Sequence, residues 1–381
     1  MGFQTADVVV VGGGPTGLAA AIALRQTGAD VLVADALEPP IDKACGEGLM
    51  PDSLRELSSL GIDLAAEQGA SFLGIRFADE RSTVSAEFAR GTGLGVRRLA
   101  LHRQLLDRAE TMGVRMRWKT RVDLPTGHSP MLGGETLCYK YLIGADGEAS
   151  RTRAWAGLNA GALRSRRFGF RAHFEFADGR DTESHPGRSH VEVHWGDRGQ
   201  AYVTPVGEHR VCVSVISRWQ SPSTFQSVID SIPVLRESLS RAKQLTPQRG
   251  AVTTTSRFRR VTYGNVALVG DASGSADAIT GEGLAMGFRQ ALLLRDSIAD
   301  GGLELYQAQH SDILRLPQQM ARVMLLMDRH AGLRRQILRS VAARPDLFAA
   351  MLRVHLNEEG LAAVVMRQGT EFGRRLLSPT G

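Results

Sequence analysis

A glycine-rich hexapeptide near the start of the chain has the residue types and the spacing that bind a pyrophosphate. It lies between a run of four valines and an alanine-rich segment, and it consists of Gly12, Gly13, Gly14, Pro15, Thr16 and Gly17. Between a strand and a helix, Gly12 would make the tight turn, Gly14 would let the backbone approach the phosphates, and Gly17 would let helix and strand pack closely. Asp35 ends the next apolar run, where its carboxylate can accept hydrogen bonds from ribose hydroxyls. The pattern predicts a dinucleotide site and leaves NAD and FAD both open.

Two later elements favour FAD. The first is a Gly-Ala-Asp-Gly sequence that contains Asp146, with Ser150 and Arg153 in the next turn. It resembles the GADGxxSxxR element of flavin-dependent aromatic hydroxylases and their relatives. The second is a Val-Gly-Asp-Ala sequence that contains Gly270 and Asp271, and it is similar to the second FAD fingerprint of the same superfamily. The resemblance implies that the cofactor is FAD, that Asp146 and Gly270 help to bind it, and that Asp271 contacts its ribityl chain.

A second glycine-rich turn opens a later helix. It consists of Thr280, Gly281, Glu282 and Gly283, and an apolar helical pattern follows it. The N–H groups and the dipole of that helix would face the pyrimidine end of the flavin, where negative charge appears on reduction. We therefore expect Gly281, Glu282 and Gly283 to bind the cofactor. Arg103 matches the position where the superfamily has an arginine near the FAD pyrophosphate; an ordinary arginine on a helix surface is the alternative.

Cys45 lies in the sequence Cys-Gly-Glu-Gly-Leu, which is similar to a loop of the geranylgeranyl reductase branch of the superfamily. In that branch a cysteine of this loop lies near the flavin ring. The resemblance makes Cys45 a catalytic candidate, because a thiol there could relay a proton or shape the substrate pocket, and nearby Lys43 could lower its pKa. A small buried apolar cysteine is the alternative. The chain differs from the branch in having Ala278 where a proline is usual, and from the hydroxylases in having Ser273 where a histidine is usual.

The apolar patterns place these motifs in two interleaved parts. Val8–Val11, Leu18–Gln26 and Val31–Ala34 predict a β-α-β unit, and alternating apolar residues between about 191 and 215 predict an antiparallel sheet. The predicted fold class is α/β (α+β), a Rossmann-like FAD-binding domain with an inserted antiparallel-sheet substrate domain and a helical C-terminal tail. We expect residues 1–69, 95–156 and 258–302 in the FAD-binding domain, 70–94 and 157–257 in the substrate domain, and 303–381 in the tail.

Composition and charge exclude several classes of protein. The net charge is +6, yet the arginines are scattered and lack interleaved aromatic residues, which argues against nucleic acid as a partner. No apolar run approaches the roughly 18 residues needed to cross a bilayer. Three widely spaced cysteines without a secretory leader indicate a reducing cytoplasm. We expect no metal site, and ordinary surface or sheet positions for the histidines considered, which are His102, His173, His190, His194, His209 and His310.

Two further segments have simple interpretations. Gly91–Gly95 is expected to be a flexible connection, because no apolar strand precedes it. The methionine-rich stretch with Leu314, Met320, Val323, Met324 and Met327 on related faces predicts a helix that faces the core. Weak contact with a membrane, or with substrate, is the alternative for that stretch.

The combination favours a FAD-dependent monooxygenase that uses O2 and NADPH or NADH on a small apolar or aromatic metabolite, in secondary metabolism. The first alternative is a FAD-dependent reductase of a C=C bond in an isoprenoid-like or acyl substrate, and the second is a non-catalytic flavin-binding protein. Because no second dinucleotide-binding unit is present, the nicotinamide cofactor would bind transiently as electron donor. The inserted sheet would line the substrate pocket, with Phe170, Trp195 and Tyr202 as candidates by their aromatic type. The sequence assigns neither a general acid or base nor an oligomeric state.

Overall fold

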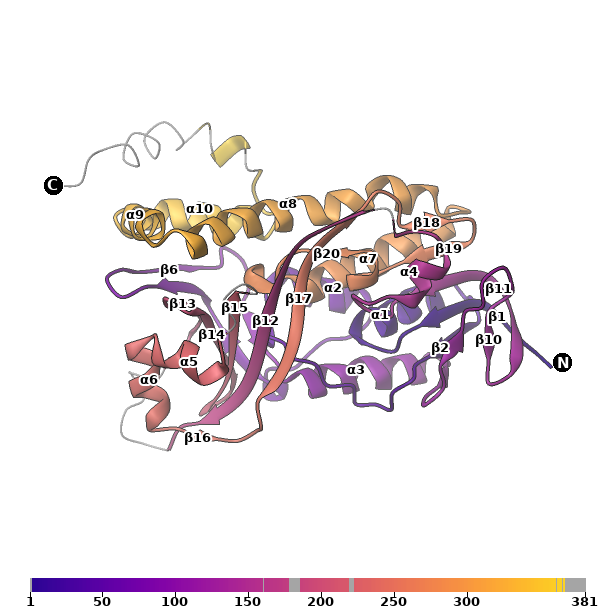
Figure 1. The fold of residues 1–381 in the computed structure, drawn as a ribbon, viewed down its shortest axis with the longest axis horizontal. Helices are drawn as coiled ribbons and strands as arrows, with labels where there is room; N and C mark the ends of the chain where they lie inside the picture. Colours follow the sequence, from indigo (N-terminus) through magenta and orange to yellow (C-terminus); the bar gives the residue numbers. More distant parts are fainter. Residues whose placement is uncertain are drawn as a thin grey trace.

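The computed structural model describes residues 2–159, 161–177, 186–218, 223–360, 362–364 and 366, which form two large sheets flanked by helices (Figure 1). A mostly parallel sheet lies toward the N-terminus, and a mostly antiparallel sheet lies at the other end of the molecule. The long paired strands β12 (Gly161–Glu175) and β17 (Arg249–Phe258) run between the two halves. The α/β (α+β) fold class expected from the sequence is confirmed.

The parallel sheet is built around β1 (Phe3–Val11), which pairs in parallel with β11 (Glu135–Gly144) on one side and with β2 (Val31–Ala34) on the other. All four residues of β2 are buried, which is why its sequence is a continuous apolar run rather than an alternating one. A hairpin of β9 (Val122–Asp123) and β10 (Met131–Leu132) extends β11. The main strands, in their order across the sheet, are β18 (Thr262–Tyr263), β19 (Val266–Leu268), β11 (Glu135–Gly144), β1 (Phe3–Val11), β2 (Val31–Ala34) and β8 (Arg115–Arg117).

Helix α1 (Pro15–Arg25) connects β1 to β2 and is fully buried from Leu18 to Leu24. Its alanines let it pack closely against α7 (Gly283–Ala299) and α3 (Arg98–Thr111). Two shorter helices accompany this layer, α2 (Pro51–Ser59) beside α7 and α4 (Arg151–Trp155) after β11. The helices place the ends of three glycine-rich segments at the same edge of the parallel sheet.

The antiparallel sheet has two faces that pack against different parts of the molecule. Cross-strand partners share a face, so the register puts Arg171, Ser214, Tyr202 and Val193 on one face, which we call the inner face. The outer face packs against α5 (Phe225–Asp230) and α6 (Pro233–Ser240). The strands, beside β12 and β17, are β20 (Gly274–Ser275), β15 (Arg210–Arg218), β14 (Gly199–Gly207), β13 (His190–Trp195), β5 (Gly74–Ala78), β6 (Thr83–Glu87) and β16 (Lys243–Gln244).

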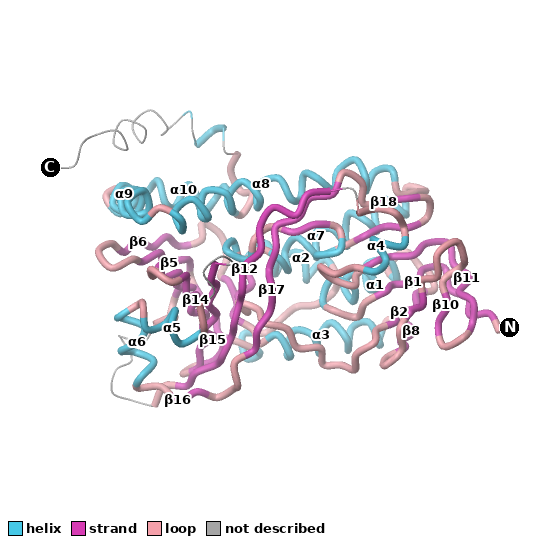
Figure 2. The backbone as a smooth tube through the Cα atoms, in the orientation of Figure 1, coloured by secondary structure: helices cyan, strands magenta, loops and turns pink. Residues whose placement is uncertain are grey.

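The C-terminal region is helical, as expected. Helix α8 (Glu304–Arg329) runs along α7, and α9 (Ala331–Ala342) and α10 (Pro345–His355) lie over β6 at the end of the antiparallel sheet (Figure 2). Met324 and Met327 join inner-face residues in one apolar cluster, so the core-facing interpretation of the methionine-rich stretch is confirmed for them. Val323, by contrast, is 46% exposed. Among the helices of the described part of the chain, none is both long and apolar enough to cross a membrane.

Two expectations from the sequence are wrong. Gly91–Gly95 is not a flexible connection, because Gly93–Gly95 forms β7 in a small sheet with β3 (Gly48–Leu49) and β4 (Ala70–Phe72). A Cβ at Gly95 would lie 1.7 Å from the carbonyl oxygen of Pro205, so glycine serves close packing there. His102 and His310 are neither surface nor sheet residues; they lie on α3 and α8 and are buried.

Candidate active site

The first two motifs are packed together at the ends of β1 and β11. Gly12 has a φ of +112°, and a Cβ there would lie 2.4 Å from the carbonyl oxygen of Ala145, next to Asp146. A Cβ at Gly17 would lie 1.9 Å from the carbonyl oxygen of Gly12. Only glycine fits either position, because backbone atoms cannot move aside. The Ala145 N–H donates to the Val11 carbonyl (2.8 Å), which fixes the second motif beside the first.

The third motif is held by Thr16 of the first. A Cβ at Gly270 would lie 3.2 Å from the Thr16 side chain, and one at Gly287 of α7 would lie 2.3 Å from Thr16 Oγ1. The Gly270 N–H also donates to Gln290 Oε1 (2.6 Å) on the same helix. Segments that lie more than 250 residues apart in sequence therefore meet at one point.

The turn of the first motif is fixed by side chains from outside it. Asp35 Oδ2 accepts the Gly13 N–H (2.7 Å), and Asp35 Oδ1 accepts the N–H of Leu37 (2.7 Å). His102 Nε2 lies 2.9 Å from the Gly13 carbonyl oxygen, and burial lowers the pKa of this histidine. A neutral ring with its hydrogen on Nε2 fits this contact, because the carbonyl can only accept. Sequence reasoning missed His102, since nothing in its local pattern indicates a contact with residue 13.

Asp146 has a structural role in addition to the one expected. Its carboxylate accepts the N–H groups of Arg151 (2.8 Å) and Thr152 (2.9 Å) and the hydroxyl of Ser150, so it caps α4. Arg153 donates to the carbonyl oxygen of Ala272 (3.0 Å), beside Asp271, and so joins the second motif to the third. The carboxylate of Asp146 is thus already engaged by the protein, and its backbone is what remains for a cofactor.

The space around these motifs fits FAD. A Cβ at Gly14, Gly281 or Gly283 would meet nothing within 4 Å, so all three glycines border open space. Arg103 is exposed on α3 and directly follows His102, whose ring contacts the Gly13 carbonyl oxygen. Asp271 keeps 38% of its side chain exposed, and Lys43 Nζ lies 3.0 Å from its Oδ2. Open glycine backbone, a helix N-terminus and flanking cations match a diphosphate and a ribityl chain.

The loop that carries Cys45 is anchored to the inner face through Glu47. Glu47 has a φ of +60° and is 3% exposed. Its Oε2 lies 2.7 Å from His173 Nε2, and its Oε1 accepts the Arg98 N–H (2.9 Å) at the start of α3. The Cys212 thiol points at the Cys45 carbonyl oxygen (3.5 Å). The half-buried Cys45 is therefore held against the inner face.

Glu47, His173 and Cys212 also have the donor types of a metal site, with their ligand atoms within 4.8 Å of one another. The direct contact between Glu47 and His173 uses the atoms that a metal would need. Burial raises the pKa of the Cys212 thiol well above its ordinary value, which disfavours the thiolate that binds metals. We therefore interpret the group as a hydrogen-bonded anchor.

Two of the three aromatic candidates lie on the inner face. The Tyr202 hydroxyl donates to the Ile279 carbonyl oxygen (2.8 Å), just before the Thr-Gly-Glu-Gly turn, and burial raises its pKa. Trp195 lies opposite Gln200 and packs in the apolar cluster below α8. Phe170 lies on the outer face, opposite Val215, and packs against the α5–α6 core. Its aromatic type does not reveal its face, because a shift of one residue along a strand reverses the direction.

A row of buried donors crosses the inner face beside Tyr202. Arg167 Nη2 donates to Gln200 Oε1 (3.1 Å), and Gln200 lies opposite Trp195. Arg167 is also ion-paired, with Nη1 3.5 Å from Asp277 Oδ1 and Nη2 3.4 Å from Asp328 Oδ2. Three nitrogens of this row have no acceptor among the described residues, namely Arg167 Nε, Gln200 Nε2 and Trp195 Nε1. The three side chains are 3%, 0% and 2% exposed. Buried donors of this kind are rare without an acceptor from water or from a ligand.

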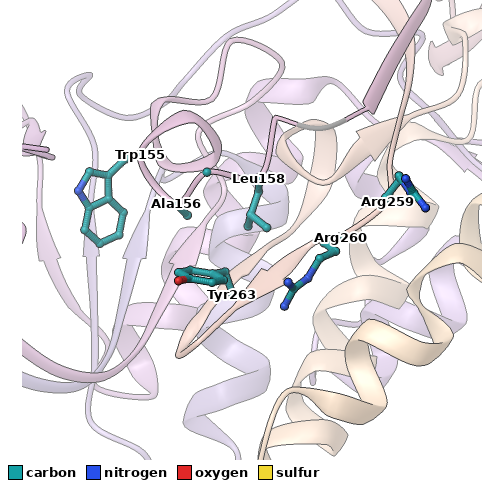
Figure 3. A pocket seen from close by; sticks show the side chains of 7 residues that line it. Trp155, Ala156, Leu158, Arg259, Arg260 and Tyr263 are labelled. Atoms are coloured by element: carbon teal, nitrogen blue, oxygen red, sulfur yellow. The ribbon is translucent and has the colours of Figure 1, made fainter. Parts of the chain in front are cut away.

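A separate depression lies on the outside of the parallel-sheet half and contains none of these residues. Its volume is about 780 Å³, and its lining includes Trp155, Leu158, Arg260 and Tyr263, which surround it in Figure 3. It is lined by none of the glycines of the three motifs, so we do not assign it to the cofactor.

Comparison with known proteins agrees with this geometry. Residues 5–301 match the sequence profile of the FAD binding domain family. The chain is 27% identical over 330 residues to the menaquinone reductase of Mycolicibacterium smegmatis, covering 80% of this chain and 78% of that protein. It is 28% identical to the digeranylgeranylglycerophospholipid reductase of Methanothrix thermoacetophila, covering 77% and 78%. A flavoprotein/dehydrogenase from Cytophaga hutchinsonii has a similar solved structure, with a TM-score of 0.77, 16% identity and coverage of 93% of each chain.

Proposed function

Because this chain belongs to the FAD binding domain family, we propose that it is a FAD-dependent oxidoreductase that reduces a C=C bond of an apolar, isoprenoid-like or acyl substrate. The sequence alone favoured a monooxygenase. Similarity along most of the chain to two proteins named as reductases, one of them of a geranylgeranyl lipid, supports the reductase more. The transient electron donor would be NADPH or NADH.

The observation that carries the proposal is the anchored Cys45 loop. The Glu47–His173 contact and the Arg98 N–H hold Glu47, and the Lys43–Asp271 pair holds the loop beside the third motif. A Cβ at Gly46 would lie 3.8 Å from Ser214 Oγ of the inner face. A substrate bound on the inner face at the edge of this loop would lie beside Cys45.

The division of labour follows from these positions. When bound, FAD would supply the hydride for one carbon of the double bond. Cys45 would deliver the proton to the other carbon, and solvent would reprotonate the half-buried thiolate. The apolar cluster with Met324 and Met327 would hold the hydrocarbon, because methionine adapts to irregular apolar shapes. The assignment of residues 1–69, 95–156 and 258–302 to cofactor binding is part of the same proposal.

A specific observation favours a monooxygenase as the second candidate. The free N–H groups of Arg167 Nε, Gln200 Nε2 and Trp195 Nε1 could donate to a phenol, carbonyl or carboxylate oxygen of an aromatic or polyketide-like substrate. A plain hydrocarbon would leave these donors without an acceptor.

Anaerobic single-turnover spectroscopy distinguishes the two reactions. The holoenzyme would be reduced with dithionite and mixed with a polyprenyl alcohol such as geranylgeraniol in the absence of oxygen. Return of the oxidised flavin spectrum is expected of the reductase, with a slower return in Cys45→Ser. A flavin that stays reduced until oxygen is admitted, with every polyprenyl and acyl probe tried, would contradict the reductase.

A further inference from the structure

Glu282 is a buried carboxyl group whose two oxygens accept no hydrogen bond from the described residues. Neither Oε1 nor Oε2 finds a hydrogen-bond donor in the part of the chain that the structure describes, and the residue is 1% exposed. Burial without a hydrogen-bond donor strongly disfavours the charged form of a carboxyl group. We therefore expect the protonation state of the Glu282 carboxyl group to respond to a change in nearby charge.

The charges that face Glu282 come from three helices. His355 Nδ1 of α10 lies 3.7 Å from Glu282 Oε2, too far for a hydrogen bond. Arg289 of α7 is engaged by Asp52 and, at 3.4 Å, by Glu56, both of α2. Burial raises the pKa of Glu282, Asp52 acts in the same direction, and His355, Arg289 and the nearby Thr280 hydroxyl oppose it. Among the described residues, His355 is the basic group in contact with the Glu282 carboxyl group.

The position of Glu282 couples it to the cofactor site. It is the residue directly before α7, and its carbonyl accepts the Met286 N–H (3.0 Å) as the first bond of that helix. The N–H groups of the first turn lack partners within the helix, and the flanking Gly281 and Gly283 border open space. A negative charge that arrives at this helix end would be felt by Glu282 through a medium of low dielectric constant.

We propose that Glu282, assisted by His355, is a redox-linked proton site. The inference rests on the proposed function, because it requires FAD to be bound and reduced at this helix end. Reduction by two electrons adds one proton to the flavin itself and leaves it with one negative charge. Glu282 then takes up a second proton, and it releases this proton when the flavin is reoxidised. Two electrons and two protons thus enter together, and the net charge of the site does not change.

The test is the pH dependence of the flavin midpoint potential, measured by spectroelectrochemistry on the holoenzyme. Between about pH 5 and about pH 9, the wild type is expected to show a region with two protons per two electrons. Glu282→Gln, which keeps the shape and cannot titrate, is expected to show one proton throughout. His355→Asn removes the basic group 3.7 Å from Glu282 Oε2, which favours the carboxylate, so the two-proton region should move to higher pH.

Glu56→Gln is the matched control. Glu56 is a partly buried acid beside the same Arg289, and burial raises its pKa too, but it lies on α2 away from the glycine turn. Its variant should keep the two-proton region. Equal proton counts in wild type and Glu282→Gln, with FAD bound in both, would overturn the inference and leave the proposed function standing. Failure of the wild type to retain or reduce FAD would contradict the proposed function itself.

Discussion

The two halves of the candidate site differ in how completely their polar side chains are hydrogen-bonded. At the glycine motifs, the carboxylates of Asp35 and Asp146 are hydrogen-bonded by the protein itself. On the inner face and beside α7, the side chains of Arg167, Trp195 and Glu282 are buried with polar atoms that form no hydrogen bond with any described residue. In the first half, which we call the cradle, the side chains are therefore already paired and the backbone groups remain for a ligand. The second half keeps buried polar atoms that could still form hydrogen bonds. Buried polar atoms without hydrogen bonds indicate where a ligand or a proton binds.

Replacing a packed glycine of the cradle should have the largest effect. Gly17→Val would place side-chain atoms against the Gly12 carbonyl oxygen, which a Cβ already approaches to 1.9 Å. We expect a loss of stability of about 3 kcal/mol or more, and loss of bound FAD. Thermal unfolding and the flavin absorbance measure both effects. Gly332→Ala, on α9 with open space around it, is the control and should behave like the wild type.

Acid should weaken the packing behind the cradle through His310. Its Nε2 lies 2.9 Å from Ser273 Oγ, and burial lowers its pKa to about 4. Since the unfolded chain binds this proton near pH 6.5, stability is complete above that pH and is lost as the pH falls toward about 4. The loss attributable to this residue is about 3 kcal/mol at most. Chemical denaturation at several pH values in this range should show that the free energy of unfolding of His310→Gln depends less steeply on pH than that of the wild type. An equally steep dependence would contradict the assignment.

Removing the cap of α4 should have a smaller effect. Asp146→Ala loses the acceptor of the Arg151 and Thr152 N–H groups, which should cost about 1 to 2 kcal/mol. FAD affinity of the folded variant should change little, because the carboxylate is engaged within the protein. Denaturant titration and flavin binding separate the two quantities. A large loss of affinity at unchanged stability would show that the side chain itself binds the cofactor.

The smallest change in stability is expected on the inner face. Trp195→Phe removes an N–H that has no acceptor among the described residues, so the free energy of unfolding should change by less than about 1 kcal/mol. Trp155→Phe is the matched comparison, because its N–H donates to the Pro125 carbonyl oxygen (3.0 Å) and should cost about 1 kcal/mol. A larger loss of unfolding free energy in Trp195→Phe than in Trp155→Phe would contradict the difference proposed between the two halves.

This contrast also explains what the sequence could predict. The fold class and the meeting of the three motifs follow from local patterns, since a glycine turn between a strand and a helix is read within one segment. The partners of Glu47 and Glu282 cannot be predicted from local patterns, because His173 and His355 come from strands and helices that are distant in the sequence. The face of Phe170 depended on strand register, which alternation alone could not fix. Buried polar atoms without partners became visible only once packing was known.

The most direct test of the central claim is the mass of the product. The holoenzyme, NADPH or NADH, and a polyprenyl substrate would be incubated under ¹⁸O2 and, in parallel, under nitrogen. Our account predicts a product that has gained two hydrogens and no ¹⁸O, formed under both atmospheres. A product that contains one ¹⁸O atom and forms only with oxygen would contradict it and establish the monooxygenase instead.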